Sequence, residues 1–267
     1  MSGQKESTRP DYGIDAPGVI RNLAIVAVVL LLIVLASQLG ILPVALVLQP
    51  SEQVRISFPL APMGLSSGLG FAAGAAWMYF GSRYGKIAER NKLLDRITWR
   101  GDERVLDVGC GRGLVLVGAA RRLTTGSATG VDIWQSEDLS GNRADVPVNN
   151  ARLEGVGERV SVQTADMRRL PFPDNSFDVV ISRAAIHNIY NAPDRAAAIR
   201  EIARVLKPGG QALIVDIRHL PDYCRTFAEH GCPDARLLDS RLWSALTALV
   251  TMGSLRPNTL LARKSAT

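Results

Sequence analysis

The amino-acid sequence divides into an apolar N-terminal third and a longer part in which apolar and polar segments alternate. No charged residue occurs in residues 22–51, and residues 23–35 consist only of Leu, Ile, Val and Ala. A second uncharged stretch covers residues 56–82. Because about 20 apolar residues in a helix span the hydrocarbon core of a bilayer, this pattern predicts two transmembrane helices, about 23–45 and 60–82.

The second apolar stretch is rich in small residues at helical spacing. They recur every four positions at Gly64, Gly68, Ala72 and Ala76. Small residues at this spacing let two helices pack closely in lipid, so we expect residues 23–82 to form a helical hairpin after a flexible lead-in of residues 1–22. A signal peptide is the alternative, since residues 34–36 resemble a cleavage site after an apolar core, but it leaves the second stretch unexplained.

Basic residues predict the orientation of the hairpin in a membrane. Four of them closely follow the second stretch, namely Arg83, Lys86, Arg90 and Lys92. The loop between the two predicted helices offers only Arg55. Because positive charge favours the cytoplasmic side, we expect a multi-pass membrane protein with both its N-terminus and its C-terminal domain in the cytoplasm.

Residues 83–103 link the hairpin to the rest of the chain. Apolar residues recur among the basic ones, at Ile87, Leu93, Leu94 and Ile97. This pattern is typical either of an amphipathic helix on anionic lipid or of a helix that covers the edge of a sheet. We favour the second interpretation.

From residue 104 onward, short apolar runs alternate with helix-like segments. The expected strands are residues 104–108, 128–133, 160–163, 177–182 and 212–217. The expected helices are residues 114–123, 147–153 and 192–206. This alternation predicts an α/β domain over residues 104–267, with a mostly parallel sheet and helices on both faces.

Residues 105–113, VLDVGCGRG, join the first strand of this domain to its first helix. Glycines at alternate positions allow backbone conformations closed to other residues and let a ligand approach the main chain. In parallel sheets, ligands bind beyond the carboxyl ends of the strands. The turn therefore predicts a site for a nucleotide-like ligand.

Composition and charge narrow the possible partners. The formal net charge is +6, but the basic residues are scattered outside the segment after the hairpin, so anionic lipid is the favoured anionic partner and nucleic acid is disfavoured. The chain has three cysteines, too few for a disulfide framework. Their spacing predicts no metal site, and free thiols suit a reducing compartment.

Further motifs follow the glycine turn in order. They are GVDIW at 130–134, TADMRRLPF at 164–172, FDVVISRAAIHNI at 177–189 and RVLKPGG at 204–210. Together with VLDVGCGRG they resemble the motifs of class I S-adenosylmethionine-dependent methyltransferases. Their sequences are most similar to those of the ubiquinone/menaquinone-biosynthesis branch. A dinucleotide-binding turn would instead need glycine at Leu114. The resemblance covers about residues 93–264 and implies a Rossmann-like, seven-stranded sheet.

The resemblance also implies a cofactor, S-adenosyl-L-methionine, and residues that hold it. Asp132 is expected to accept hydrogen bonds from the ribose hydroxyls, while Ile133 packs on the adenine ring. Asp166 is expected to accept from the adenine amino group, and Met167 supplies a backbone amide. The other expected cofactor contacts are Asp107, Gly109, Cys110, Gly111, Gly113 and Arg183, with Cys110 as a packing residue.

Methyl transfer requires the protein to align the acceptor, exclude water and in some cases remove a proton. His187 is the favoured candidate for a general base, because imidazole titrates near neutral pH. Asn188, Tyr190 and His219 are weaker candidates, and Asp216 follows the fifth strand at the rim of the expected pocket.

The sequence predicts a membrane-anchored methyltransferase with a small-molecule or lipid-like acceptor on the cytoplasmic side. A membrane-tethered module that binds the cofactor without catalysis is the alternative. Two segments are left open. Residues 135–148 suit a lid over the site, and residues 240–254 suit either an edge strand or an amphipathic segment at the membrane.

Overall fold

The structure is a computed structural model that describes residues 9–135, 139, 141–240 and 257–266. The chain forms two compact units. The hairpin unit comprises Gly13–Lys86 and Glu137–Ser140. The other unit comprises Met1–Tyr12, Ile87–Ser136 and Gly141–Thr267 and is called the catalytic unit below, because it contains the domain that the sequence predicts to be catalytic. The lead-in up to Tyr12 therefore belongs to the same unit as the glycine turn.

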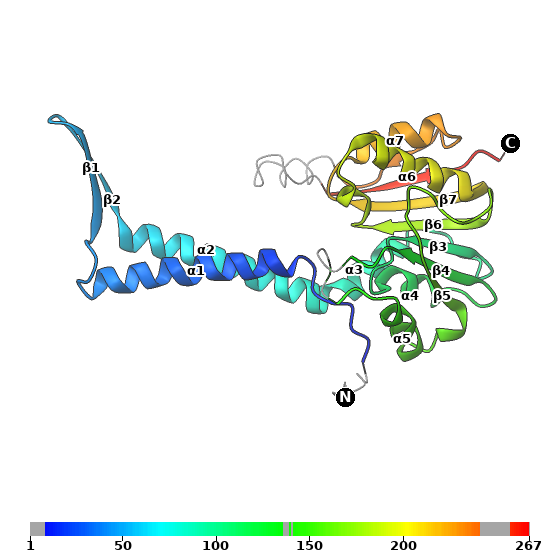
Figure 1. Ribbon diagram of the computed structural model, residues 1–267, viewed down its shortest axis with the longest axis horizontal. Helices are drawn as coiled ribbons and strands as arrows, with labels where there is room; N and C mark the ends of the chain where they lie inside the picture. The colour runs from blue at the N-terminus through cyan, green and yellow to red at the C-terminus, as the bar shows by residue number, and fades with distance from the viewer. Residues whose placement is uncertain (1–8, 136–138, 140, 241–256, 267) are drawn as a thin grey trace. The chain divides into compact units, whose positions relative to one another are not determined.

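The hairpin unit contains two helices joined by a β-hairpin (Figure 1). Its elements in chain order are α1 (Pro17–Gln38), β1 (Ala45–Ser51), β2 (Val54–Pro59), α2 (Leu60–Phe80) and the π-helical turn η1 (Gly81–Gly85). The first helix ends earlier than the expected residue 45. Gly40 adopts φ +72° just after it, and Pro43 lacks an N–H to continue the helical bonding, so the chain turns into antiparallel strands that pair Leu46 with Phe58.

The two helices pack through small residues of α2. A Cβ atom on Gly64 would lie 2.6 Å from Val34 Cγ2, and one on Gly68 would lie 3.1 Å from Leu31. Neighbouring Gly70 meets nothing within 4 Å. The row that begins Gly64–Gly68 therefore faces α1.

Polar groups join the opposite ends of the two helices. Lys86 Nζ lies 2.9 Å from Asp15 Oδ1 and donates to Gly13 O at 2.9 Å, and the Asp15 amide donates to Ser82 Oγ at 3.1 Å. The start of α1 and the end of α2 are thus held together, as an antiparallel hairpin requires.

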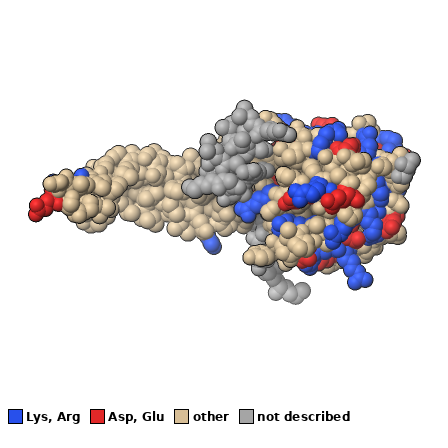
Figure 2. Space-filling view, turned by 90° about the horizontal axis from the view of Figure 1, so that it is seen from above, with Lys and Arg blue, Asp and Glu red and all other residues tan. Residues whose placement is uncertain are grey.

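One helix within the described residues, α1, is long and apolar enough to cross a membrane. Only Ala27 and Ser37 of this helix are buried. Signal sequences and buried core helices have similar length and composition. Figure 2 shows the surface along the two helices almost free of charged side chains, while acidic and basic side chains crowd the catalytic unit.

The segment after the hairpin packs on the sheet of the catalytic unit. Helix α3 (Lys86–Leu94) ends with Leu94, which has no exposed surface, and Ile97 follows it at 3% exposure. Both belong to a cluster that includes Val105 and Leu116. These side chains therefore cover the sheet instead of forming an apolar face toward lipid.

The catalytic unit is built on a mostly parallel sheet, in the order β5-β4-β3-β6-β7-β9-β8. Its strands are β3 (Arg104–Val108), β4 (Ser127–Asp132), β5 (Val160–Thr164), β6 (Phe177–Arg183), β7 (Leu206–Asp216), β8 (Arg236–Leu237) and β9 (Asn258–Arg263). The first five are parallel, and β9 runs antiparallel to both β7 and β8. The α/β Rossmann-like prediction is confirmed. Most of the segment 240–254 lies outside the described residues.

Helices cover both faces of this sheet because successive strand residues point to opposite sides. They are α4 (Leu114–Ala120), α5 (Asp145–Leu153), α6 (Ala192–Val205) and α7 (Leu220–Glu229), with short 3₁₀ turns η2 (Gly157–Arg159) and η3 (Ile186–Asn188). Leu106 and Val180 pack in a cluster with α6 and α7. Val105 and Val179 pack in the other, with α4. Figure 1 shows this layered arrangement.

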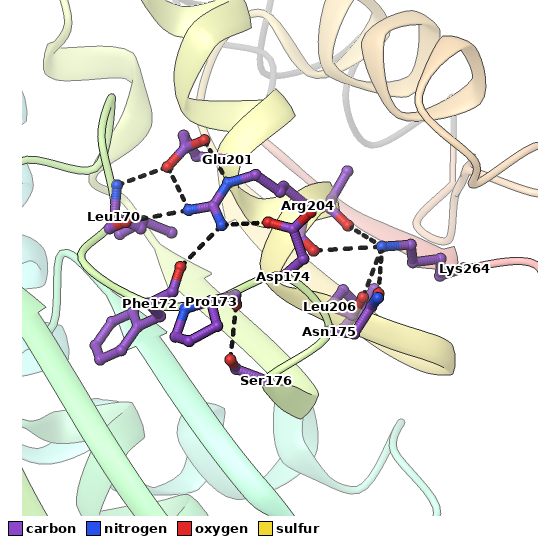
Figure 3. Close-up of polar contacts among 11 residues, drawn as sticks. Leu170, Phe172, Pro173, Asp174, Asn175, Ser176, Glu201, Arg204, Leu206 and Lys264 are labelled. Carbon is purple, nitrogen blue, oxygen red and sulfur yellow. Dashed lines mark hydrogen bonds and ion pairs between the residues drawn. The ribbon is translucent and has the colours of Figure 1, made fainter.

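The RVLKPGG motif has a structural role on the amino side of β6 (Figure 3). Arg204 donates to the carbonyl oxygens of Phe172 and Leu170, at 2.8 and 3.1 Å, and pairs with Glu201. Lys264 Nζ donates to the carbonyl oxygen of Leu206 at 2.8 Å. Arg204 thus satisfies carbonyl groups of the loop before β6, and Lys264 satisfies the carbonyl group at the start of β7. Both charges lie at the opposite end of the strands from the ligand edge.

Candidate functional site

The glycine turn between β3 and α4 requires glycine for conformational reasons. Gly109, Gly111 and Gly113 adopt φ values of +74°, +51° and +81°, a region that other residues enter only with strain. The amide groups of Gly109 and Cys110 both donate to Val131 O, at 2.8 and 3.0 Å. The turn is therefore held against the end of β4.

Close packing reinforces this requirement. A Cβ on Gly109 would lie 2.3 Å from Ala185 Cβ and 3.4 Å from Met167 Cε, so the turn touches the loops after β6 and β5. A Cβ on Gly130 would lie 2.7 Å from Cys110 Sγ. Cys110 is therefore a packing residue. Burial also raises the pKa of its thiol, which makes it a poor nucleophile.

Asp107 precedes the turn and is nearly fully buried. Its Oδ2 atom has no hydrogen-bond partner within the part of the chain that the structure describes. Burial raises the pKa of this carboxyl to about 7. A buried carboxylate without a full set of partners is costly, so this group fits a site that receives a polar or cationic ligand.

Asp132 ends β4 and accepts hydrogen bonds from three directions. The donors are Gly111 N at 2.8 Å, Trp134 N at 2.7 Å and Asn142 Nδ2 at 3.3 Å. A carboxylate has about four lone-pair positions, so it retains capacity for a further donor. The next residue, Ile133, is 50% exposed and offers an apolar surface beside it.

The expected lid segment is only partly described. Asn142 Nδ2 also donates to Gln135 O, at 3.0 Å, and so ties this segment to the carboxylate of Asp132. Residues 136–138 and 140 lie outside the described part.

Asp166 follows β5 and already has a partner. Arg168 donates to both of its carboxylate oxygens and also pairs with Asp194 at 2.8 Å. Hydrogen bonding to Arg168 lowers the pKa of Asp166. An adenine amino group at this carboxylate would have to share it with the guanidinium, a feature that the sequence motif does not reveal.

Arg183 and Ser182 end β6 beside the turn. Ser182 Oγ donates to Val108 O at 2.7 Å, which fixes the ends of β6 and β3 to each other. Arg183 Nη2 lies 3.3 Å from Glu89 Oε2 on α3. The ion pair with α3 therefore restrains the Arg183 side chain.

His187 and Asp216 form a hydrogen-bonded pair in the same region. His187 Nδ1 lies 2.5 Å from Asp216 Oδ1, and the His187 amide donates to Asp216 Oδ2 at 3.0 Å. Asp216 is buried at the end of β7 and also accepts from Ile217 N at 2.8 Å and from Tyr223 OH at 3.4 Å. With the Nδ1 proton donated to Asp216, the Nε2 atom is left as a proton acceptor.

The weaker sequence candidates have other environments. Tyr190 is almost fully exposed, and His219 adopts φ +64° before α7. Burial lowers the pKa of His219. Neither has a hydrogen bond to the His187–Asp216 pair among the described contacts.

Sequence reasoning placed Asp216 at the pocket rim but did not pair it with His187. The available signal was topological, because parallel neighbours β6 and β7 bring their carboxyl ends to one edge. Sequence reasoning also missed Asn142, Asn150 and Arg112. Their partners are loop carbonyls or distant residues, which no local pattern identifies.

Comparison with known proteins finds methyltransferases. Residues 106–214 match the family described as "Methyltransferase domain". Methyltransferase GfsG of Streptomyces halstedii is 38% identical over 126 residues, which cover 47% of this chain and 42% of GfsG. The 27-O-demethylrifamycin SV methyltransferase of Amycolatopsis mediterranei is 34% identical over 134 residues, covering 49% and 44%.

A ubiquinone/menaquinone biosynthesis C-methyltransferase is also among the relatives. The protein from Dinoroseobacter shibae is 30% identical over 133 residues, covering 50% of each chain. Among solved structures, geranyl diphosphate C-methyltransferase from Streptomyces coelicolor in complex with S-adenosyl-L-homocysteine has a TM-score of 0.52 at 19% identity, covering 66% of this chain and 78% of that one. This chain spans half or less of the three curated relatives.

Residues 106–214 of the catalytic unit thus match a methyltransferase domain, and the relatives from Streptomyces halstedii and Amycolatopsis mediterranei are both methyltransferases. The motifs predict S-adenosylmethionine as the cofactor, and the Streptomyces coelicolor structure holds S-adenosyl-L-homocysteine. The buried Asp107 oxygen fits such a ligand, and so does the glycine turn, where Gly109 and Gly113 leave no room for a Cβ atom.

Proposed function

We propose that the whole protein is a membrane-anchored enzyme that transfers a methyl group from S-adenosylmethionine to a hydroxyl group of a small or lipid-like acceptor on the cytoplasmic side. The observation that carries the reaction is the His187–Asp216 pair. Ala185, two residues before His187, is packed against Gly109 of the turn. A proton acceptor thus stands beside the expected cofactor site.

Cofactor residues keep the roles that the motifs suggest. The Gly109–Gly113 turn would take the methionine part against its main chain, with Asp107 near the ammonium group. Asp132 would accept from the ribose, and Ile133 and Met167 would flank the adenine with Asp166. When bound, the cofactor supplies an electrophilic methyl group on a sulfonium.

The protein's own part in catalysis is to orient and deprotonate the acceptor. Asp216 fixes the His187 ring and its tautomer, so that Nε2 takes the hydroxyl proton as the new bond forms. An imidazolium at His187 would be stabilised by the neighbouring carboxylate, which is buried and therefore weakly screened. Because hydroxyl acceptors need this proton removed, the pair favours O-methylation.

Membrane anchoring is supported by the hairpin unit. Helix α1 is exposed along most of its length, and α2 carries exposed apolar residues that include Trp77 at 82%. A two-helix transmembrane hairpin would bury these surfaces in lipid. A methyl acceptor that partitions into the membrane would then be concentrated near the catalytic unit.

The function is tested by incubating the full-length protein with a cell lipid extract, a cytosolic extract and isotopically labelled cofactor. Mass spectrometry is expected to find one labelled product class, bearing a methyl ether, in the lipid fraction. Binding of S-adenosylhomocysteine by calorimetry without any labelled product would favour the non-catalytic module. A labelled carbon or nitrogen acceptor would contradict the proposed hydroxyl chemistry.

Topology is tested by cysteine labelling in intact cells. Glu52→Cys, in the turn between β1 and β2, is expected to react with a membrane-impermeant reagent, while exposed Glu158→Cys reacts only after lysis. Labelling of Glu158→Cys from outside would contradict a cytoplasmic catalytic unit, because the cofactor is kept inside the cell.

Cofactor affinity is expected to depend on pH through Asp107. Since its pKa is about 7 in the cofactor-free protein and a neighbouring ammonium favours the carboxylate, binding should release a proton. Affinity for S-adenosylhomocysteine should therefore rise from about pH 5.5 to about pH 7.5 and then level off. Calorimetry in buffers of different ionisation enthalpy measures the proton release. Asp107→Asn should remove the dependence, and its persistence in that variant would assign it elsewhere.

A further inference from the structure

Residues of the N-terminal lead-in pair with the catalytic unit directly beside the glycine turn. Asn150 of α5 is buried, and its Oδ1 accepts from Asp11 N at 2.9 Å while its Nδ2 donates to Asp11 O at 2.9 Å. The same Nδ2 donates to Arg112 O at 2.9 Å. One buried amide thus holds both the lead-in backbone and the turn backbone.

Arg112, in the middle of the turn, repeats this connection through its side chain. Its Nε donates to Asp11 O at 2.9 Å, and its Nη2 pairs with Asp11 Oδ2 at 2.7 Å. Its Nη1 donates to Gly141 O at 3.2 Å. A guanidinium that binds a carboxylate and two carbonyl groups in fixed directions restrains the residue that carries it.

Tyr12 anchors the lead-in at the C-terminal end of α5, where Glu154 is the C-cap. Its ring is buried, and its hydroxyl donates to Glu154. Arg90, at 1% exposure, pairs with Glu154 at 3.1 Å and lies 5.9 Å from the Tyr12 ring centre. Breaking a buried charge pair is strongly destabilising because one charge is left without a partner. The Arg90–Glu154 pair and the Tyr12 hydroxyl bonded to it are therefore expected to keep this arrangement.

We propose that Asp11 and Tyr12 form a strap that holds the cofactor turn in its binding conformation, with Arg112 and Asn150 as positioning residues. The inference rests on the proposed placement of the cofactor at this turn. Arg112 lies between Gly111, whose amide donates to Asp132, and Gly113, the N-cap of α4. Fixing Arg112 therefore fixes the orientation of both neighbours.

The strap also gives the lead-in to the first apolar helix an effect on the cofactor site. Pro17 begins α1 shortly after Tyr12 in the chain. Because coupling between two sites is reciprocal, a strap that favours cofactor binding is itself stabilised when the cofactor binds. Release of the strap should weaken binding, and cofactor should protect the strap.

The test uses the full chain in detergent micelles and S-adenosylhomocysteine as the probe. Arg112→Gln and Asn150→Leu are each expected to weaken binding about tenfold in calorimetry. Arg143→Gln serves as the matched control, because Arg143 pairs with Asp145 on the exposed start of the same helix. The double variant Asp11→Asn with Arg112→Gln should bind no more weakly than Arg112→Gln alone, since the two act through one contact.

Hydrogen exchange on the unmodified protein gives an independent measurement. The Asp11 amide, which donates to Asn150, should exchange more slowly when S-adenosylhomocysteine is bound. Equal affinity in the Arg112 and Asn150 variants, or unchanged exchange at Asp11, would overturn the strap while leaving the cofactor site in place. Failure of the unmodified protein to bind the probe would instead overturn the proposed function. If a variant fails to fold, exchange in the unmodified protein decides.

Discussion

Replacing Asp216 by asparagine is expected to lower turnover by about 10²- to 10⁴-fold while leaving the affinity for S-adenosylhomocysteine nearly unchanged. Asparagine keeps the size of the side chain but its NH₂ group can face His187 Nδ1. The imidazole then loses the partner that fixes its tautomer and stabilises its protonated form. The measurement is kcat and KM for the acceptor found by isotope labelling, together with calorimetry for the cofactor product.

Asp222→Asn is the matched control for this prediction. Asp222 is exposed in the first turn of α7 and pairs with Arg225 at 3.2 Å on the surface, so its removal should leave turnover unchanged. His187→Gln is expected to reduce kcat as strongly as Asp216→Asn, because the pair acts as one unit. If either variant had the turnover of the unmodified protein, His187 would have a structural role and not a catalytic one.

Replacing Gly109 by alanine is expected to abolish cofactor binding and to destabilise the catalytic unit. A non-glycine residue at a left-handed φ costs about 1–3 kcal/mol, and the new Cβ would lie 2.3 Å from Ala185 Cβ. The loop that carries His187 would have to move away from the turn. Calorimetry with S-adenosylhomocysteine and thermal unfolding of the full chain measure the two effects.

Gly155→Ala separates the two causes. Gly155 adopts φ +73° but a Cβ there would meet nothing within 4 Å, so this variant carries the conformational cost alone. It is expected to lower stability slightly and to keep cofactor affinity. If Gly109→Ala behaved like Gly155→Ala, close packing between the turn and the loop after β6 would have no part in cofactor binding.

Much of the catalytic unit follows from sequence periodicity. The strands at 104–108, 160–163 and 177–182 lie within one or two residues of β3, β5 and β6. Strands β3 and β6 are mostly buried, so they read as short apolar runs. The edge strand β5 is partly exposed and begins with alternating apolar and polar residues. Strand β7 begins at Leu206, earlier than the expected residue 212, because the KPGG sequence was read only as a breaker. Leu206 pairs with Phe177 of β6 before a register shift, and regular pairing with β6 and β9 runs from Gln211 onward.

The hairpin unit shows where local reading is insufficient. Composition indicated an uncharged segment from residue 22 to residue 51, but hydropathy does not distinguish a long helix from a shorter helix followed by a strand. Backbone pairing between β1 and β2 decides the matter. Small-residue spacing did predict the face of α2 that contacts α1, since Gly64 and Gly68 leave room for Val34 and Leu31.

The sequence alone predicted the class of domain and, through the resemblance of its motifs to those of class I S-adenosylmethionine-dependent methyltransferases, its cofactor. A strand, a turn that only glycine can form, and acids at the ends of successive strands are local features, and their order along the chain identifies them. Tertiary structure alone decided which side chains meet. Asp216 joins His187, Arg168 occupies Asp166, and Asn150 joins Asp11 to Arg112. Arg168 and Asp166 are only two residues apart. The other partners are far apart in the chain, and only the stacking of parallel strands and the packing of helices on them bring their side chains within hydrogen-bond distance.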